Sequence, residues 1–199
     1  MNKYISIFFC VQIIALNLFA MQPKVTPVDY VRPQIDTHKS RWFFFSSASR
    51  PFGMVSLSPD TWTEGSWNSG YLYNSKEIRC FSHVHCWQLA GVPVMPTTGE
   101  VKGHKGMDAY KSTYSHETEI VKPGYHKVEL DTYQIRVELT STSRVGMHRY
   151  TYPAGEKANV LFDVGALLAH GKTEKAAIHR ISSKEIGGYS VLAPTSVSY

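Results

Sequence analysis

The stretch IRCFSHVHCWQLAG holds the closest grouping of side chains in this chain that could bind a metal, form a disulfide or contact a ligand. Two histidines, His83 and His85, stand two residues apart between Cys80 and Cys86, with Trp87 next in line. In an extended segment the two imidazoles point to the same face, where they could bind zinc or copper with Cys80 as a third ligand. Three other interpretations stay open: a disulfide between the cysteines, histidines that brace a loop through hydrogen bonds, and a loop that contacts a ligand.

A metal site on this segment needs further ligands from elsewhere in the chain. Structural zinc takes four ligands in a familiar spacing, and no second pair of ligands stands clearly elsewhere in the sequence. The candidates, which could contribute only if folding brings them close, are His116, Glu117, Glu119 and His126. A metal-dependent protein built on Cys80, His83, His85 and Cys86 is therefore one hypothesis for the function.

A second candidate is the stretch SRPFGMVSLSPDT. Gly53 lacks a Cβ and Pro51 fixes the backbone angle at the entry, so the backbone here can approach a ligand or another element closely. The alternative is a bend that leads into a strand. Aromatic residues follow in DTWTEGSWNSGYLY, and they could form the floor of a sugar site or the edge of the core.

The composition is that of an ordinary globular protein. Of 199 residues, 43% are hydrophobic and 19% are charged, which excludes a disordered chain. The net charge of +5 is spread out, and its densest cluster, in VKGHKGMDAYK, is interrupted by glycines. A nucleic-acid surface should be longer and more regular, so we expect no nucleic-acid partner.

The first twenty residues, MNKYISIFFCVQIIALNLFA, differ from the rest. They have a lysine near the start, then an apolar run, then a small residue at Ala20. This layout predicts a signal peptide over residues 1–20, with a retained membrane anchor as the alternative. Residues 21–27 are expected to be a linker and residues 28–199 one domain. We therefore expect an exported protein, periplasmic or extracellular and either free or membrane-tethered, whose mature form keeps Cys80 and Cys86.

The periodic segments indicate β-strands. Alternating runs rich in β-branched and aromatic residues predict strands at 125–130, 134–140, 146–152 and 159–164. GMVSLSPDT predicts another strand, and IHRISSKEIGGYSVL predicts a hairpin with its turn near residues 184–188. Helical signals are weak, although residues 75–80 and 167–175 could each hold a turn or two. The pattern predicts an all-β fold, an antiparallel β-sandwich or barrel.

Five successive blocks resemble, in the same order, the N-terminal domain of glycoside hydrolase family 92, the exo-acting α-mannosidases. The blocks are PFGMVSLSPDT, GYLYNSKEIRCFSHVH, VPVMPTTGE, YSHETEIVKPGYHKVEL and ELTSTSRVGMHRYTYP, and the resemblance runs from about Val28 to at least Asp163. The usual form of the central motif is a glycine followed by FSHxH. Here Cys80 stands in place of that glycine, and Cys86 also departs from the pattern.

The resemblance implies a two-domain enzyme. Its N-terminal domain would be an antiparallel β-sandwich of the galactose-mutarotase-like kind, and its C-terminal domain an (α/α)6 barrel that we do not expect within these residues. The family hydrolyses α-mannosidic linkages with inversion, which needs a general acid and a general base spaced to admit a water. It also requires a calcium ion that contacts the mannose. The catalytic carboxylates and the calcium ligands would lie mainly in the C-terminal domain, so we expect neither a catalytic residue nor a metal in this chain alone.

The residues expected by motif match to face the sugar are Phe52, Gly53, His83, His85 and Trp87. The imidazoles would hydrogen-bond sugar hydroxyls or the neighbouring domain, and the indole would offer an apolar face to a ring or pack in the interface. The first hypothesis is therefore the front part of an exported α-mannosidase, inactive until joined to its catalytic domain in cis or as a separate chain. The second is a free-standing module that binds α-mannoside-containing glycans.

Overall fold

The computed structural model describes residues 25–38, 48–63, 70–85, 89–90, 92–166 and 173–193. The chain divides into two units, Met1–Val31 and Arg32–Tyr199. The described part of the first unit holds a single turn of 3-10 helix, η1 (Pro27–Tyr30). Within the described ranges, no helix is long and apolar enough to cross a membrane. The signal peptide at residues 1–20 and most of the linker lie outside these ranges and stay predictions.

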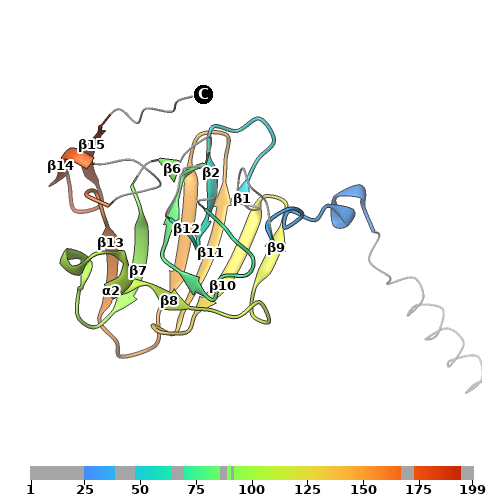
Figure 1. Ribbon diagram of the computed structural model, residues 1–199, viewed down its shortest axis with the longest axis horizontal. Coiled ribbons are helices and arrows are strands. Elements are labelled where there is room, and N and C mark those ends of the chain that lie inside the picture. The colour runs from blue at the N-terminus through green and yellow to red at the C-terminus, as the bar shows by residue number, and fades with distance from the viewer. Residues whose placement is uncertain are drawn as a thin grey trace, which may run out of the picture. The chain divides into compact units, whose positions relative to one another are not determined.

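The larger sheet of the second unit has five antiparallel strands in the order β1, β2, β4, β7, β13 (Figure 1). Their bounds are β1 (Ala48–Ser49), β2 (Ser56–Asp60), β4 (Cys80–Ser82), β7 (Val94–Thr98) and β13 (Ala158–Phe162). Strand β13 pairs with β7 from Ala158 opposite Thr98 to Phe162 opposite Val94. The sheet therefore joins segments that are far apart in the sequence.

The second sheet has four antiparallel strands in the order β12, β11, β10, β9. They are β9 (Ile120–Lys122), β10 (Tyr125–Leu130), β11 (Ile135–Ser141) and β12 (Gly146–Thr151). Along β11 the buried positions Ile135, Val137 and Leu139 alternate with Arg136, Glu138 and Thr140, which point outward. This period of two fixes which face of the sheet packs against the core.

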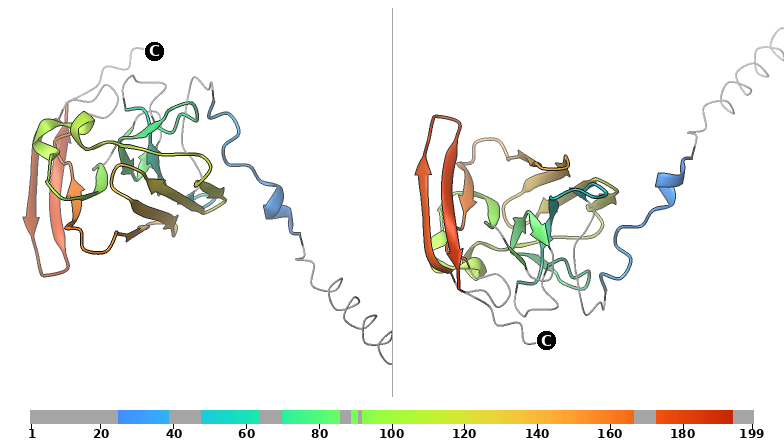
Figure 2. Two further views of the ribbon diagram at one scale, coloured as in Figure 1. Left: turned by 90° about the horizontal axis from the view of Figure 1, so that it is seen from below. Right: turned by 90° about the horizontal axis from the view of Figure 1, so that it is seen from above.

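Three two-stranded pairs complete the described strands. They are β3 (Glu77–Ile78) with β8 (Ser112–Thr113), β5 (Val84–His85) with β6 (Leu89–Ala90), and β14 (Thr173–Arg180) with β15 (Ile186–Leu192). Between β7 and β8 lie a short 3-10 helix, η2 (Gly103–Lys105), and one helical turn, α2 (Met107–Tyr110). The β14–β15 hairpin stands beside β13 (Figure 2).

Buried apolar side chains from both main sheets form one core. The five-stranded sheet contributes Leu57, Phe81 and Met95, and the four-stranded sheet contributes Val128, Leu130, Ile135, Val137 and Leu139. The two sheets thus face each other across a shared layer of side chains, which is the arrangement of a sandwich. The prediction of an all-β antiparallel β-sandwich is confirmed.

The expected strands match closely where the alternation is strong. Strand β10 coincides with the predicted run 125–130, and β11 and β12 agree with their predictions to within one residue at each end. The helical turn expected at residues 75–80 is wrong: β3 and the start of β4 occupy it, and Ile78 and Cys80 are fully buried on alternate positions. The helix expected at residues 167–175 is wrong from Thr173, where β14 begins, and its earlier part lies outside the described residues.

A matched pair of substitutions tests the core. Leu57 is fully buried, whereas Met54, three residues earlier, is 75% exposed. We expect Leu57→Ala to lower the free energy of unfolding by about 2–5 kcal/mol, because it removes buried methyl groups and leaves a cavity. We expect Met54→Ala to change it by less than about 0.5 kcal/mol. Urea denaturation followed by tryptophan fluorescence measures both, and equal effects would contradict this placement of the core.

Candidate functional site

The turn between β1 and β2, residues 50–55, carries the first candidate residues. The Gly53 amide donates a hydrogen bond to the Arg50 carbonyl at 2.9 Å, which closes the turn. A Cβ on Gly53 would lie 3.1 Å from that oxygen, so the glycine permits the tight approach that the sequence predicts. Phe52 adopts the left-handed region at φ 60 and its side chain is fully exposed. This conformation is unusual for a bulky residue.

The turn between β11 and β12, residues 142–145, lies against the first turn. The Met54 amide donates to the Ser143 carbonyl at 2.8 Å. Exposed apolar side chains gather on these two turns and the start of β12: Phe52, Met54, Val145 and Met147. We call this end of the sandwich, at the top of Figure 1, the loop end. It presents apolar surface that no described residue covers.

The histidine segment runs beside this end of β2. The Ser56 amide donates to the His83 carbonyl at 3.0 Å, which holds the segment against the five-stranded sheet. Val84 is exposed between His83, which is half-buried, and His85, which is buried. The chain bends at His83 between β4 and β5, and the two imidazoles have different partners.

His85 is bound on both ring nitrogens. Its Nε2 lies 2.6 Å from Asp60 Oδ1, and its Nδ1 lies 2.5 Å from the Ser56 carbonyl oxygen. A carbonyl and a carboxylate only accept, so both ring nitrogens donate and the imidazole is charged. Burial opposes this charge, but Asp60 and the two hydrogen bonds outweigh it and raise the pKa of His85. His85 therefore forms a buried ion pair beneath the loop end and has no free nitrogen for a metal or a sugar.

Cys80 and Ser82 complete the surroundings of this pair. The Cys80 thiol is free, fully buried, and donates to Asp60 Oδ2 at 3.3 Å. Burial, followed by the nearby Asp60 carboxylate, raises the pKa of Cys80 well above its usual range, which keeps the thiol protonated. Ser82 Oγ lies 3.2 Å from His85 Nε2. Cys80 is thus an additional donor to Asp60.

His83 points instead to the four-stranded sheet. Its Nε2 lies 2.9 Å from the Nε2 of His148 on β12, and His148 Nδ1 lies 2.7 Å from the Tyr150 hydroxyl. Gly146 makes room for this contact, because a Cβ there would lie only 2.5 Å from His83 Cδ2. Sequence reasoning did not find His148 and Tyr150, although both lie in ELTSTSRVGMHRYTYP, one of the five motif blocks.

A second buried polar cluster surrounds Glu119. Its carboxylate accepts hydrogen bonds from Tyr71 Oη at 2.9 Å and Gln34 Nε2 at 3.3 Å, and contacts His116 Nδ1 at 2.6 Å and His126 Nε2 at 2.9 Å. Burial favours the neutral acid, but the hydrogen bonds from both histidines and Tyr71 outweigh it and lower the pKa of Glu119. Folding thus joins three of the four extra ligand candidates to one another and to Tyr71, not to His83 or His85.

The described residues do not build a metal site. Among them, no group of three or more histidine, cysteine, aspartate or glutamate side chains is placed to hold an ion. Calcium takes six to eight oxygen ligands. The buried carboxylates here are engaged by other groups: Asp60 by His85 and Cys80, and Glu119 by the cluster above. The half-buried Asp163 accepts from the Tyr110 hydroxyl at 2.8 Å. Cys86 and Trp87 lie outside the described residues, so their expected roles stay predictions.

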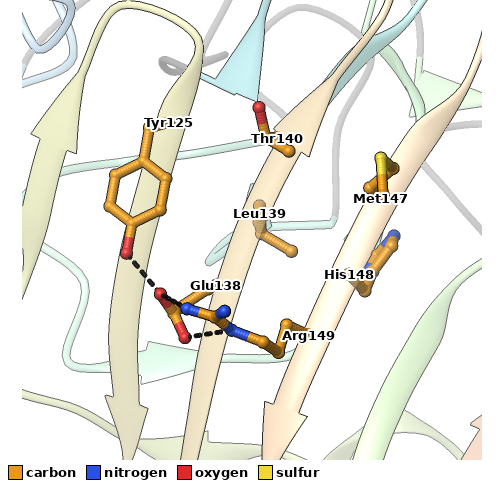
Figure 3. Close-up of a pocket in the computed structure, with 7 residues that line it drawn as sticks. All are labelled: Tyr125, Glu138, Leu139, Thr140, Met147, His148 and Arg149. Carbon is orange, nitrogen blue, oxygen red and sulfur yellow. Dashed lines mark hydrogen bonds and ion pairs between the residues drawn. The ribbon is translucent and has the colours of Figure 1, made fainter.

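A pocket of about 260 Å³ lies on the outer face of the four-stranded sheet (Figure 3). Its side chains include Tyr125, Thr140 and Met147. Among its lining residues, Arg149 binds Glu138 through Nε at 2.6 Å and Nη2 at 2.5 Å, and the Tyr125 hydroxyl donates to Glu138 Oε1 at 2.7 Å. These polar groups satisfy one another. The pocket is therefore a weaker candidate than the loop end, where no described residue covers the exposed apolar side chains.

Comparison with known proteins decides the family. The sequence profile of the glycosyl hydrolase family 92 N-terminal domain matches residues 30–198. The chain belongs to this family. Two solved structures of a family GH92 alpha-mannosidase from Bacteroides thetaiotaomicron, one without and one with mannoimidazole, are 34% and 33% identical to it, with TM-scores of 0.75 and 0.73. Each covers 83% of this chain, which in turn covers 24% and 23% of theirs.

A further family GH92 structure shares the fold at lower identity. An inverting mannosidase from Bacteroides thetaiotaomicron VPI-5482 is 22% identical with a TM-score of 0.66, covering 84% of this chain while this chain covers 22% of it. No curated protein sequence matches the chain. The chain is thus a family GH92 N-terminal domain that spans about a quarter of the length of the solved mannosidases it matches.

The buried ion pair predicts a specific pH dependence. The pKa of His85 is raised in the folded protein, so the pair's contribution is complete below the ordinary histidine pKa of 6.5. It is lost as the pH rises through the higher folded value. At pH 6 we expect Asp60→Asn to lower the free energy of unfolding by about 3–5 kcal/mol, and the difference from wild type should shrink toward pH 9.

The matched control is Asp131→Asn, since Asp131 is exposed in the turn that follows β10. It should change the free energy of unfolding by less than about 0.5 kcal/mol at either pH. Urea midpoints between pH 6 and 9 measure all three proteins. A penalty for Asp60→Asn that grows with pH would show that His85 is neutral in the fold.

Proposed function

We propose that this domain is the front part of an exported exo-α-mannosidase that hydrolyses α-mannosidic linkages of glycans with inversion. The domain lends loops to the sugar pocket and packs against a C-terminal (α/α)6 catalytic domain, in cis or as a separate chain. By itself it is inactive. The proposal is supported by its membership of family GH92 and by the alpha-mannosidases of that family that are 33–34% identical to it.

One observation carries the proposed role of the loop end. Phe52 is fully exposed and held at φ 60, a backbone conformation that costs about 1–3 kcal/mol for such a residue. The hydrogen bonds of Gly53 and Met54 fix this geometry, although the phenyl ring gains no packing from it. An apolar side chain presented in this way suits a surface that another domain or a ligand completes.

The five expected sugar-facing residues then divide into two roles. Phe52, on the tight turn that Gly53 permits, and the half-buried His83 can reach the pocket, with Trp87 beside them as expected from the sequence. His85 supports the segment from below, because its ring is buried and both nitrogens are bound to Asp60 and Ser56. Calcium in the longer enzyme would be held mainly by the catalytic domain, since the described residues here do not form such a site.

The acid and base of the inverting reaction are proposed to lie in the catalytic domain as well. An inverting pair needs two carboxyl groups about 6.5–9.5 Å apart that face the substrate. The buried carboxylates Asp60 and Glu119 and the half-buried Asp163 are instead bound to internal partners. On this proposal, the acid and base for hydrolysis come from the catalytic domain.

The first test is the mass of the native polypeptide that carries this sequence, taken from its source cells and combined with an assay on a chromogenic α-mannoside. We expect a mass well above the 22.4 kDa of this chain, or a stable complex with a second chain, and hydrolysis in that form. The 199-residue chain alone should show none. Hydrolysis by the isolated chain, or a native protein of this size without a partner, would overturn the proposal.

A substitution tests the loop end in the active form. Phe52→Ala should lower kcat/KM by at least about tenfold, because an apolar contact of the pocket is lost. Its stability should change little, since the ring is exposed. Val101→Ala, which shortens a 45% exposed side chain ahead of η2, is the control and should leave kcat/KM unchanged. Wild-type kinetics in the Phe52→Ala enzyme would remove this residue from the pocket.

A further inference from the structure

Three side chains form a hydrogen-bonded row that leads to the loop end. The Tyr150 hydroxyl lies 2.7 Å from His148 Nδ1, and His148 Nε2 lies 2.9 Å from His83 Nε2. Tyr150 and His148 are on β12, whereas His83 lies between β4 and β5. The row thus links the two main sheets and ends at one ring nitrogen, His83 Nδ1, which makes no hydrogen bond with any described residue.

The direction of the hydrogen bonds in this row follows from their chemistry. A neutral imidazole has one donor and one acceptor nitrogen, and a phenol can donate one hydrogen. If His148 Nδ1 donated to Tyr150, the hydrogen of this half-buried phenol would be left without an acceptor among the described residues, which is unfavourable. The satisfied arrangement has Tyr150 donating to His148 Nδ1, and His148 Nε2 donating to His83 Nε2. His83 then carries its hydrogen on Nδ1.

Both imidazoles are held neutral by their surroundings. Burial and the neighbouring His83 lower the pKa of His148 to about 4. Burial and His85 also lower the pKa of His83, which Asp60 opposes. Phe81, edge-on to His148 at 6.4 Å between ring centres, adds an apolar wall on that side. A second proton on His83 would go to its Nε2, which would place two N–H groups against each other across 2.9 Å and break the row.

We propose that Tyr150 and His148 act as positioning residues that fix His83 as an Nδ1–H donor to an oxygen atom of the bound mannoside. This inference rests on the proposed function and deepens it, because it assigns a direction to one hydrogen bond in the sugar pocket. A neutral N–H donor suits a hydroxyl or ring oxygen, since it brings no charge that a neutral sugar would leave uncompensated. Gly146 is also needed for this arrangement, because its missing Cβ leaves the space for the His83 ring.

The first experiment determines the tautomers of His83 and His148 and needs no measurement of enzyme activity. In the 199-residue chain labelled with ¹⁵N-histidine, two-bond and three-bond ¹⁵N–¹H correlation spectra at pH 7.5 report which ring nitrogen carries the hydrogen. We expect His83 as the Nδ1–H form and His148 as the Nε2–H form. Tyr150→Phe should disturb this pattern, because His148 Nδ1 loses its donor. The control is Tyr152→Phe, which removes a hydroxyl that donates to the Asn159 carbonyl at 2.6 Å. An Nε2–H form of His83 in the wild-type chain would overturn the inference.

The second experiment uses the native, longer enzyme and a chromogenic α-mannoside. His83→Leu should lower kcat/KM by about tenfold or more, through the loss of one buried polar contact to substrate. His83→Asn should recover much of the loss, because the asparagine amide can place an N–H near the position of Nδ1. Tyr150→Phe should raise KM about threefold to tenfold while Tyr152→Phe has no effect.

The outcomes separate the two proposals. A wild-type enzyme that does not hydrolyse mannosides refutes the proposed function, and with it the mannoside as the ligand of His83. The tautomers of His83 and His148 are measured by NMR and do not depend on that assay. An active enzyme in which His83→Leu and His83→Asn are equally impaired refutes the donor role of Nδ1 alone. Thermal unfolding of each variant shows whether a loss of activity reflects a loss of fold.

Discussion

The buried ion pair between His85 and Asp60 holds the histidine segment in place beneath the loop end of this domain. Asp60 ends β2, His85 belongs to β5, and the second nitrogen of the imidazole binds the carbonyl of Ser56 at the start of β2. One ring therefore ties the histidine segment to both ends of a single strand. A buried charge without its partner is strongly unfavourable, so the segment cannot leave the sheet without breaking this pair. The place of His83 relative to β12 depends on it.

Two kinds of histidine lie within a few residues of each other at this end. His85 is charged because a carboxylate accepts from it, while His83 and His148 are neutral because burial and each other oppose a charge. Their contributions to stability vary in opposite directions with pH. The neutral pair loses its contribution as the pH falls below 6.5, and the ion pair loses its contribution as the pH rises above it. The loop end is thus best ordered near neutral pH.

Much of the sandwich could be predicted from the sequence, because the strands of the four-stranded sheet alternate clearly and each is bounded by a turn. The order of the motif blocks also indicated the family. The side-chain partners could not be predicted in the same way. Glu119 contacts Gln34 across 85 residues of sequence, and His83 contacts His148 across 65, so no local pattern reveals either pair. The segment at residues 75–80 was misjudged because two short strands leave too few positions for their period to show.

Gly146 has a consequence for how the family can vary. The His83 ring occupies the space where the side chain of residue 146 would stand, with 2.5 Å between its Cδ2 and the position of a Cβ. An imidazole at one position and any side chain at the other are mutually exclusive in this geometry. In the family's history the two positions should therefore change together: a relative that carries a larger residue in place of Gly146 should have given up the histidine in place of His83. Such paired change would mark which relatives have a different arrangement at this end of the sandwich.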